Sequence, residues 1–358
     1  MGQNNADSEH GGNIYKIAKK LGIAEDKLID FSASINPLGI SENVKEVIRR
    51  ELDGLIHYPD PDSTELTDTI ASHHGINADT VICGNGSTEL IYLIPRVLKP
   101  RKVLITAPAF SEYEKACLLN YELGITNYEL KEESKFNIDA DKYIDYMQGC
   151  DMAFLCNPNN PTGNLMSKES VLEIARAANE AKCFLVVDEA FIDFTPEESV
   201  IGDVKDNPYL IVLRSMTKFY ALTGLRIGYG VFHQELIQKL KECKEPWTVN
   251  NLAQKTAVTA LEDSSYAGET YGLMKEEKEY MEKCFSEMGI KHYPSSANFY
   301  LLNRSDAGSI VMKLRQKGIL VRDCSNFKGM DSSYIRVAVK SHEQNEMLIR
   351  EMKKICRV

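Results

Sequence analysis

A series of short, uniformly apolar runs constrains the fold of this 358-residue chain more than any other sequence feature. Each run has the length of one strand, and helix-like or turn-rich segments separate successive runs. Strands that are apolar on both sides suit a parallel sheet covered by helices on its two faces. We therefore expect an α/β fold with a mainly parallel central sheet and right-handed crossovers. The runs are residues 103–107, 153–157, 184–188, 210–214 and 227–232.

The pattern changes after about residue 240. A long charged helix is expected over residues 268–288, followed by strand-like segments and further helices. This order is typical of a smaller α+β domain. The first forty or so residues are expected to form an arm with one helix. The arm joins the rest of the chain at the turn-rich segment Asn36-Pro37-Leu38-Gly39. The expected division is an N-terminal arm over 1–40 associated with the small domain, a large α/β domain over 41–245 and a small α+β domain over 246–358.

Composition narrows the functional class. The net charge is −10, which argues against a nucleic-acid binder but allows arginines to hold a small anionic ligand. The nine cysteines are scattered and contain no C-x-x-C pair, so neither a disulfide framework nor a metal site is expected. The polar start resembles no signal peptide, and no apolar run reaches the roughly 18–20 residues that cross a bilayer. We expect a cytoplasmic protein without nucleic-acid or membrane partners.

A glycine-rich segment, CGNGSTEL over residues 83–90, leads from a strand end into a helix. Gly86 lets the backbone approach an anion, and the helix start offers unpaired N–H groups. Ser87 and Thr88 can add hydroxyl donors. Taken alone, the segment favours an ordinary capped turn, because it matches neither a Walker A loop nor a complete G-x-G-x-x-G pattern.

A rigid loop, NPNNPTG over residues 157–163, follows another apolar run. In open α/β sheets, ligands bind at the carboxyl ends of the strands, so Asn160 can donate to a ligand oxygen from this position. A turn without a binding role would have the same local sequence.

Two charged residues follow apolar runs in the same way. Asp188 ends one run, where a buried carboxylate is costly unless a cation meets it. The alternative is that Asp188 only caps the N-terminus of a helix. Lys218 ends the segment RSMTK after the next run, and a lysine there can have a lowered pKa and attack a carbonyl group. Ser215 and Lys218 also match S-x-x-K of penicillin-binding enzymes, but the S-D-N and K-T-G partners do not occur downstream.

The order of these segments resembles a known family. The set GNGSTE, NPNNPTG, VVDEAFIDF, SMTKFYALTGLRIGY and YIRVAV is similar to fold-type I enzymes of the aminotransferase class I and II group, which use pyridoxal 5′-phosphate (PLP). The resemblance extends over nearly the whole chain. It implies a PLP cofactor and an arrangement in which a lysine and a carboxylate are catalytic.

The resemblance also implies a role for each matching residue. Lys218 matches the lysine that bonds covalently to the cofactor aldehyde, and Asp188 matches the carboxylate that pairs with the ring nitrogen. Asn160 matches the partner of the phenolic oxygen, and Phe110 matches an aromatic residue stacked on the ring. Phe191 stands where the family often has tyrosine, so a packing role is expected. The implied phosphate-binding residues are Gly86, Ser87, Thr88, Ser215 and Arg226.

Two further implications concern the partner subunit and the substrate. Tyr58 resembles a tyrosine that reaches the PLP phosphate of the other subunit, which implies a homodimer. Arg336 matches the arginine that usually holds a substrate carboxylate, a bidentate task for which lysine is poorer.

Four other segments distinguish two subfamilies. They resemble L-threonine-O-3-phosphate decarboxylases, which make aminopropanol phosphate for the nucleotide loop of cobalamin, more than histidinol-phosphate aminotransferases with their N-E-N-P-like segment. A small phosphorylated amino acid is thus the expected substrate, with His10, Asn36, Arg322 and Arg336 binding it. The segments are HGGN at 10–13, DFSASINPLG at 30–39, PWTVN at 246–250 and VRDCSNF at 321–327.

Several alternatives remain open on the sequence alone. Histidinol-phosphate aminotransferase is one, and decarboxylation of L-serine O-phosphate is another, because one methyl group in a pocket is worth only about 1–3 kcal/mol. A PLP-binding protein without turnover is a third. Which arginine takes the carboxylate and which takes the phosphate is not decided by the motifs.

Overall fold

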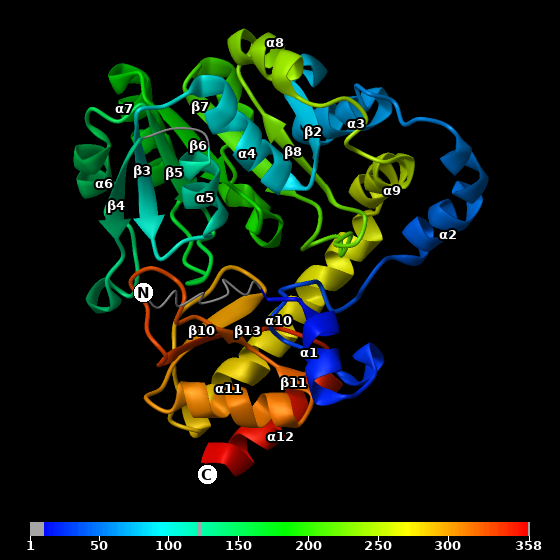
Figure 1. Ribbon diagram of the computed structural model, residues 1–358, viewed down its shortest axis with the longest axis vertical. Helices are drawn as coiled ribbons and strands as arrows, with labels where there is room; N and C mark the ends of the chain where they lie inside the picture. The colour runs from blue at the N-terminus through cyan, green and yellow to red at the C-terminus, as the bar shows by residue number, and fades with distance from the viewer. Residues whose placement is uncertain (1–10, 120–122, 357–358) are drawn as a thin grey trace, which may run out of the picture.

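A seven-stranded sheet forms the centre of the large domain in this computed structural model, which describes residues 11–119 and 123–356 (Figure 1). The strand order is β2-β8-β7-β6-β5-β3-β4. All neighbouring strands are parallel except that β8 runs antiparallel to β2 and β7. The predicted mainly parallel α/β sheet is confirmed. The strands are β2 (Val81–Asn85), β3 (Lys102–Ala107), β4 (Gly124–Glu129), β5 (Met152–Cys156), β6 (Phe184–Asp188), β7 (Leu210–Ser215) and β8 (Ile227–Val231).

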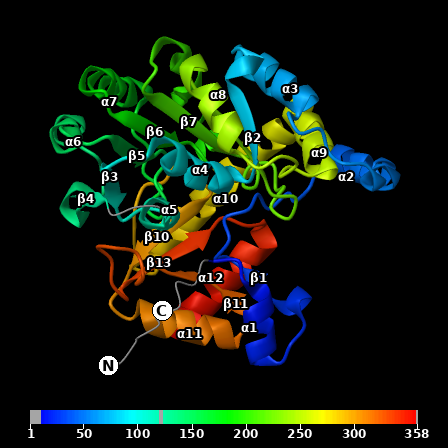
Figure 2. The same ribbon diagram turned by 45° about the horizontal axis from the view of Figure 1, so that its top comes forward.

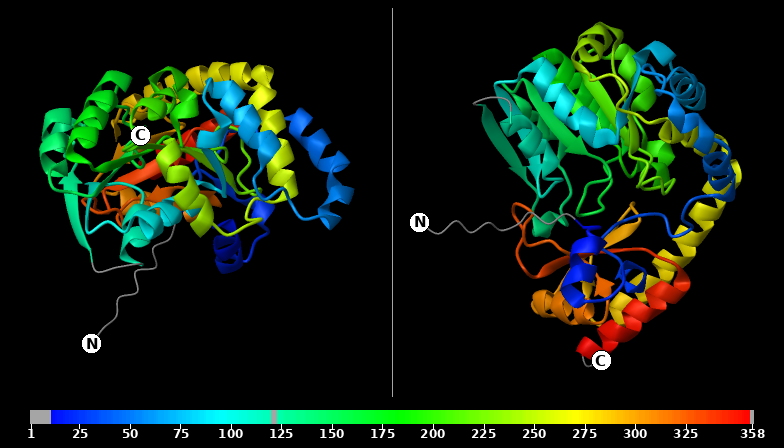
Figure 3. Two further views of the ribbon diagram at one scale, coloured as in Figure 1. Left: turned by 90° about the horizontal axis from the view of Figure 1, so that it is seen from above. Right: turned by 45° about the vertical axis from the view of Figure 1, so that its right-hand side comes forward.

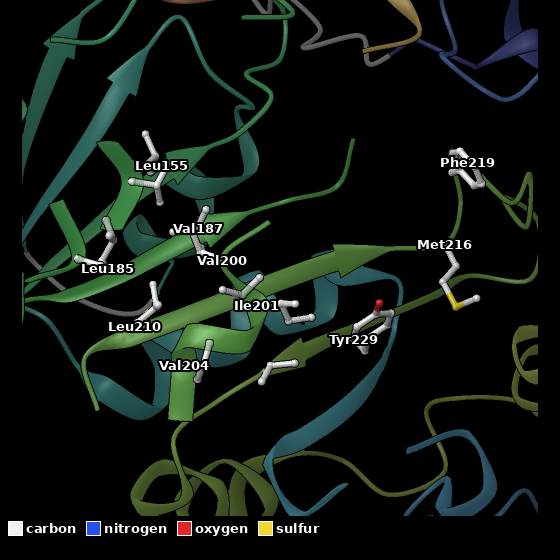
Figure 4. Packing of buried hydrophobic residues seen from close by; sticks show 14 of the residues in the cluster. Leu155, Leu185, Val187, Val200, Ile201, Val204, Leu210, Met216, Phe219 and Tyr229 are labelled. Atoms are coloured by element: carbon white, nitrogen blue, oxygen red, sulfur yellow. The ribbon is translucent and has the colours of Figure 1, made fainter. Parts of the chain in front are cut away.

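Helices cover both faces of this sheet. Because side chains alternate along a strand, Leu185 and Val187 of β6 enter one hydrophobic cluster while Val186 enters the other. Figure 4 shows part of the first cluster, in which Leu210 of β7 joins the β6 residues. The helices of this domain are α2 (Glu42–Arg50), α3 (Thr64–His74), α4 (Ser87–Leu98), α5 (Glu112–Leu118), α6 (Ala140–Met147), α7 (Lys168–Ala181), α8 (Gln234–Cys243) and α9 (Asn251–Glu262).

The small domain is built on a four-stranded antiparallel sheet, with the order β12-β13-β10-β9. Its core contains Phe285, Tyr300, Ile335 and Leu348, which come from two strands and two helices. The elements are α10 (Ser264–Glu287), β9 (Lys291–His292), β10 (Phe299–Asn303), α11 (Ala307–Gln316), β12 (Arg322–Asp323), β13 (Tyr334–Ala338) and α12 (His342–Cys356).

The N-terminal arm lies against the small domain (Figure 2). After α1 (Ile14–Leu21), its strand β1 (Ile29–Asp30) pairs in parallel with β11 (Ile319–Leu320). The fully buried Phe31 belongs to the small-domain core. The arm and the small domain therefore share one hydrophobic core.

The helices that follow residue 246 contribute to both hydrophobic cores. Helix α9 packs on α2 and α3, and its Ala253 and Ala257 belong to the large-domain core. The change from one core to the other occurs along α10, where Tyr266 joins the large-domain core and Met274 the small-domain core. Figure 3 shows this long helix running from one domain to the other. An alanine-rich helix such as α9 carries no pattern that identifies the domain it covers.

The described part of the chain contains no cluster of His, Cys, Asp and Glu side chains that is suited to a metal ion. None of the helices described here combines the length and the apolar character needed to cross a membrane. The cysteines are free thiols.

Candidate active site

A cavity of about 730 Å³ lies at the carboxyl ends of β5, β6 and β7, where the large domain, the arm and the small domain meet. Residues from all three parts line it. Most of the predicted site residues meet here, although they are far apart in the sequence. They are Ser87, Thr88, Phe110, Asn160, Asp188, Ser215, Lys218, Arg226, Arg322 and Arg336.

Lys218 lies in the loop that follows β7. Burial lowers the pKa of its amine to about 8, and the positive charges of Arg336 and Arg226 act in the same direction. The Asp188 carboxylate opposes this shift. The backbone oxygen of Lys218 accepts a hydrogen bond from the Asn36 N–H at 3.0 Å, which ties the loop to the arm. Near neutral pH, this amine can thus exist in both its protonated and its nucleophilic form.

Asp188 lies at the end of β6 and is 3% exposed. Its carboxylate accepts hydrogen bonds from the Tyr113 hydroxyl at 2.6 Å and from the Ala190 N–H at 3.0 Å. Burial raises its pKa, whereas the hydrogen bond from Tyr113 lowers it. It forms no ion pair within residues 11–119 and 123–356. A buried carboxylate in this state is stabilised by a cationic N–H group in the cavity.

The residues expected to bind a phosphate include the start of α4 and form a cradle there. A Cβ atom on Gly228 would lie 2.4 Å from the Ser87 nitrogen, so only glycine lets β8 pass this close to the helix start. A Cβ atom on Gly86 would lie 2.5 Å from Nη2 of Arg226, whose guanidinium therefore lies over this glycine. Ser215 shares a 2.8 Å hydrogen bond with Thr217. Helix N–H groups, hydroxyls and a guanidinium together suit a phosphate.

Arg336 reaches the cavity from β13 of the small domain. Its guanidinium donates to Oδ1 of Asn160 and to the Ser32 backbone oxygen, the second bond measuring 2.9 Å. It lies over the ring of Phe299, with 4.9 Å between its Cζ and the ring centre. Its Nε has no hydrogen-bond partner in the described part of the protein, and burial lowers its pKa to about 10. Phe191 packs edge-on against Phe299, in line with the expected packing role.

Arg322 lines both this cavity and a neighbouring one of about 310 Å³. Its Nη2 donates to Oδ1 of Asn326 at 2.7 Å, and its Cζ lies 5.0 Å from the centre of the Phe327 ring. The side chain is thus held at the junction of the two cavities.

Three of the expected residues that the structure describes, Gly86, Asn36 and Tyr58, are not among those that line the cavity. The side chain of Asn36 instead donates to the Phe219 oxygen at 2.8 Å and to the Thr270 hydroxyl at 2.7 Å. This arrangement gives it a supporting position behind the cavity wall. Tyr58 is exposed and packs against Trp247, with 5.2 Å between the ring centres. His10 lies outside the described residues.

The structure adds cavity residues that the sequence did not single out. Asp30, Thr217 and Lys340 line the cavity, and Tyr113 bonds directly to Asp188. Tyr113 follows Phe110 by one helical turn, and this spacing was the only available sign of its position. Its partner lies 75 residues away in the sequence.

The residues fit PLP. The unpaired carboxylate of Asp188 suits a protonated ring nitrogen, the cradle at α4 suits a phosphate, and Lys218 supplies an amine between them. Phe110 lines the same cavity and can cover the ring. Each of these contacts is provided by a residue already present in the chain.

Comparison with known proteins agrees with this fit. Residues 26–352 match the family described as aminotransferase class I and II. The threonine-phosphate decarboxylase of Salmonella typhimurium is 39% identical, over 98% of this chain and 97% of the relative. Two solved structures are similar. The histidinol-phosphate aminotransferase of Clostridium acetobutylicum is 31% identical with a TM-score of 0.86, and the L-threonine-O-3-phosphate decarboxylase of Porphyromonas gingivalis is 27% identical with a TM-score of 0.81. Each match covers 92% of this chain and 99% of the chain in the solved structure.

Proposed function

Because the chain belongs to the aminotransferase class I and II family, we propose that it is a PLP-dependent decarboxylase that converts L-threonine O-3-phosphate into (R)-1-aminopropan-2-yl phosphate and CO₂. This reaction serves the nucleotide loop of cobalamin. One observation carries the proposal: Arg322 and Arg336 line the same cavity as Lys218 and Asp188, and the substrate has two anionic groups on one amine. The 39% identity to a threonine-phosphate decarboxylase supports it.

The cofactor contacts follow from the site. When bound, PLP supplies an aldehyde that captures amines and a protonated ring that accepts electrons released at the substrate Cα. Lys218 holds the aldehyde through its Nζ, and Asp188 keeps the proton on the ring nitrogen. Asn160 donates to the phenolic oxygen, and Phe110 covers the ring. Gly86, Ser87, Thr88, Ser215 and Arg226 hold the phosphate.

The two arginines orient the substrate. Arg336 bonds to Asn160 beside the ring, which suits the carboxylate on Cα. Arg322 lies at the junction with the second cavity, which suits the phosphate farther along the substrate. Anchoring the phosphate fixes rotation about the bond from nitrogen to Cα. With both anions held, Arg322 and Arg336 would together set the orientation of the carboxylate that leaves as CO₂.

Lys218 also moves a proton. With a pKa of about 8, its Nζ can carry a proton in the cavity and would be the group that supplies a proton to the substrate Cα. The buried position of the loop limits the access of water to this step.

We also propose a cytoplasmic homodimer. Tyr58 lies outside its own cavity, near the exposed Leu55 and Ile56, where a second copy of the chain would bring it to the other active site. We further propose that His10 contacts the substrate.

A product assay tests the function. The PLP-loaded protein is incubated with L-threonine O-3-phosphate, with L-serine O-phosphate, and with histidinol phosphate plus 2-oxoglutarate. We expect CO₂ from the first substrate and no glutamate from the third. Lys218→Ala should release no CO₂, because it removes both the aldehyde bond and the proton donor, while Lys239→Ala on the exposed face of α8 should be fully active. Glutamate formation without CO₂ would instead establish an aminotransferase.

A further inference from the structure

Lys340 is a cationic residue of the cavity that belongs to neither the expected cofactor contacts nor the expected substrate contacts. It lines the cavity together with Asp30 and Ser32 of the arm. It follows β13 by two residues, and in extended chain the side chains of residues 336, 338 and 340 point to one face of the strand. Lys340 thus continues the row that begins with Arg336.

The backbone of Lys340 is held in place. Its N–H donates to Oδ1 of Asn345 at 3.0 Å, and its oxygen accepts from Nδ2 of Asn345 at 2.8 Å. Asn345 is completely buried and also donates to Glu277 at 2.9 Å. A side chain placed on such a fixed backbone is preorganised for binding, because little further ordering is needed.

The ammonium group of Lys340 lacks a partner. It forms no hydrogen bond or ion pair with any residue in 11–119 or 123–356. Burial lowers its pKa, and the negative charge of Asp30 opposes this shift. A partly buried cation of this kind is stabilised by an anion that enters the cavity.

Its position favours the more distant anion of the substrate. Arg336 bonds to Asn160, the expected partner of the cofactor ring, whereas Lys340 makes no such bond and lines the cavity with Asp30 and Ser32 of the arm. On the substrate, the phosphate lies farther from Cα than the carboxylate. A phosphate monoester carries close to two negative charges at neutral pH, so one arginine does not neutralise it.

We propose that Lys340 binds the phosphate group of the substrate together with Arg322, and that this pair selects phosphorylated amines. The inference rests on the proposed function for the identity of the substrate, but the phosphate contact can be tested without turnover. Arg336 then remains for the carboxylate.

The test compares three holoenzymes: wild type, Lys340→Met and Lys340→Arg. Each is titrated with O-phosphoethanolamine, which has a phosphate but no carboxylate, and with L-threonine, which has a carboxylate but no phosphate. Binding is followed by the change in cofactor absorbance. Lys340→Met should weaken O-phosphoethanolamine binding by about 10- to 100-fold, the effect of a lost charge-assisted hydrogen bond. L-Threonine binding should change less than twofold, and Lys340→Arg should retain most of the phosphate affinity.

The outcomes are distinguishable. An unchanged dissociation constant for O-phosphoethanolamine in Lys340→Met overturns the inference, and so does a loss confined to L-threonine, which would assign the lysine to the carboxylate. An unaltered cofactor spectrum before titration shows that the variant has folded and bound PLP. If wild type binds O-phosphoethanolamine but releases no CO₂ from L-threonine O-3-phosphate, the proposed function fails while the role of Lys340 is still decided.

Discussion

At the scale of single residues, the reactive groups of this protein are defined by their surroundings. The sequence singled out Lys218 and Asp188 because each follows an apolar run that ends at the sheet edge. It did not single out Tyr113, whose hydroxyl donates to Asp188 at 2.6 Å. A hydrogen bond between residues this distant in sequence leaves no local pattern, because it depends on how α5 packs on β6.

Tyr113→Phe should impair catalysis through Asp188. The hydroxyl lowers the pKa of a carboxylate that burial raises, so its removal raises that pKa further. The carboxylate then becomes protonated at higher pH and loses its charge opposite the ring nitrogen. We expect kcat to fall about tenfold, consistent with a lost hydrogen bond to a charged group, and the acidic limb of the kcat profile to move to higher pH.

A matched substitution separates this effect from general destabilisation. Tyr143→Phe removes another buried hydroxyl, which donates to the Phe154 oxygen at 3.0 Å outside the cavity. It should lower stability similarly while leaving the acidic limb where it is in wild type. If Tyr113→Phe also leaves that limb in place, Tyr113 has only a packing role.

At the scale of elements, the strands and their mainly parallel arrangement were largely predictable, whereas the antiparallel direction of β8 was not. Uniformly apolar runs predicted β3, β5, β6, β7 and β8 with small errors at their ends. The half-exposed edge strand β4 was missed, because polar residues such as Asn127 interrupt its pattern. Strand β8 runs antiparallel because the loop that carries Lys218 turns the chain back beside β7. The apolar content of a strand does not indicate its direction.

Close packing of two elements should make Gly228 intolerant of a side chain. In Gly228→Ala, the new Cβ would lie 2.4 Å from the Ser87 nitrogen and 2.8 Å from the Arg214 oxygen, and both are backbone atoms. The start of α4 must therefore shift. We expect a loss of about 1–3 kcal/mol in the free energy of unfolding and at least tenfold weaker PLP binding, measured by denaturant unfolding and absorbance titration.

Gly272 on α10 provides the control, because a Cβ there would meet no atom within 4 Å. Gly272→Ala should stabilise the protein by about 0.5–1 kcal/mol, since alanine is the better helix former. It should not change PLP affinity. Equal PLP affinities of Gly228→Ala and wild type would show that the cradle tolerates the displacement.

At the scale of the whole molecule, side chains of both domains meet at Glu132. This large-domain residue accepts hydrogen bonds from the hydroxyls of Tyr293 at 2.5 Å and Tyr334 at 2.9 Å, and it pairs with Lys291. All three partners belong to the small domain. The sequence could not predict this contact, because it joins segments about 160 to 200 residues apart.

Glu132→Ala should weaken this contact in a pH-dependent way. Hydrogen bonds from Lys291, Tyr293 and Tyr334 lower the pKa of Glu132 to about 2 from its ordinary value of 4.5. A carboxylate whose pKa is lower in the folded state stabilises that state at pH values above its ordinary pKa. This stabilisation is lost as the pH falls toward the lower pKa of the folded state. The variant should lose about 1–3 kcal/mol at neutral pH through its missing hydrogen bonds.

Thermal unfolding at several pH values checks this expectation. The difference in Tm between wild type and Glu132→Ala should be largest near neutral pH and should shrink below about pH 4.5. A Tm difference that stays constant across this range would mean that the charge of Glu132 contributes nothing to the contact.

The position of Asn36 has a mechanical consequence. Its side chain and its N–H join three parts of the protein: the arm, the loop of Lys218 and Phe219, and Thr270 on α10. A rotation of the small domain about α10 must either break one of these bonds or drag the lysine loop with it. The orientation of the long helix and the position of the reacting amine are therefore mechanically coupled through Asn36.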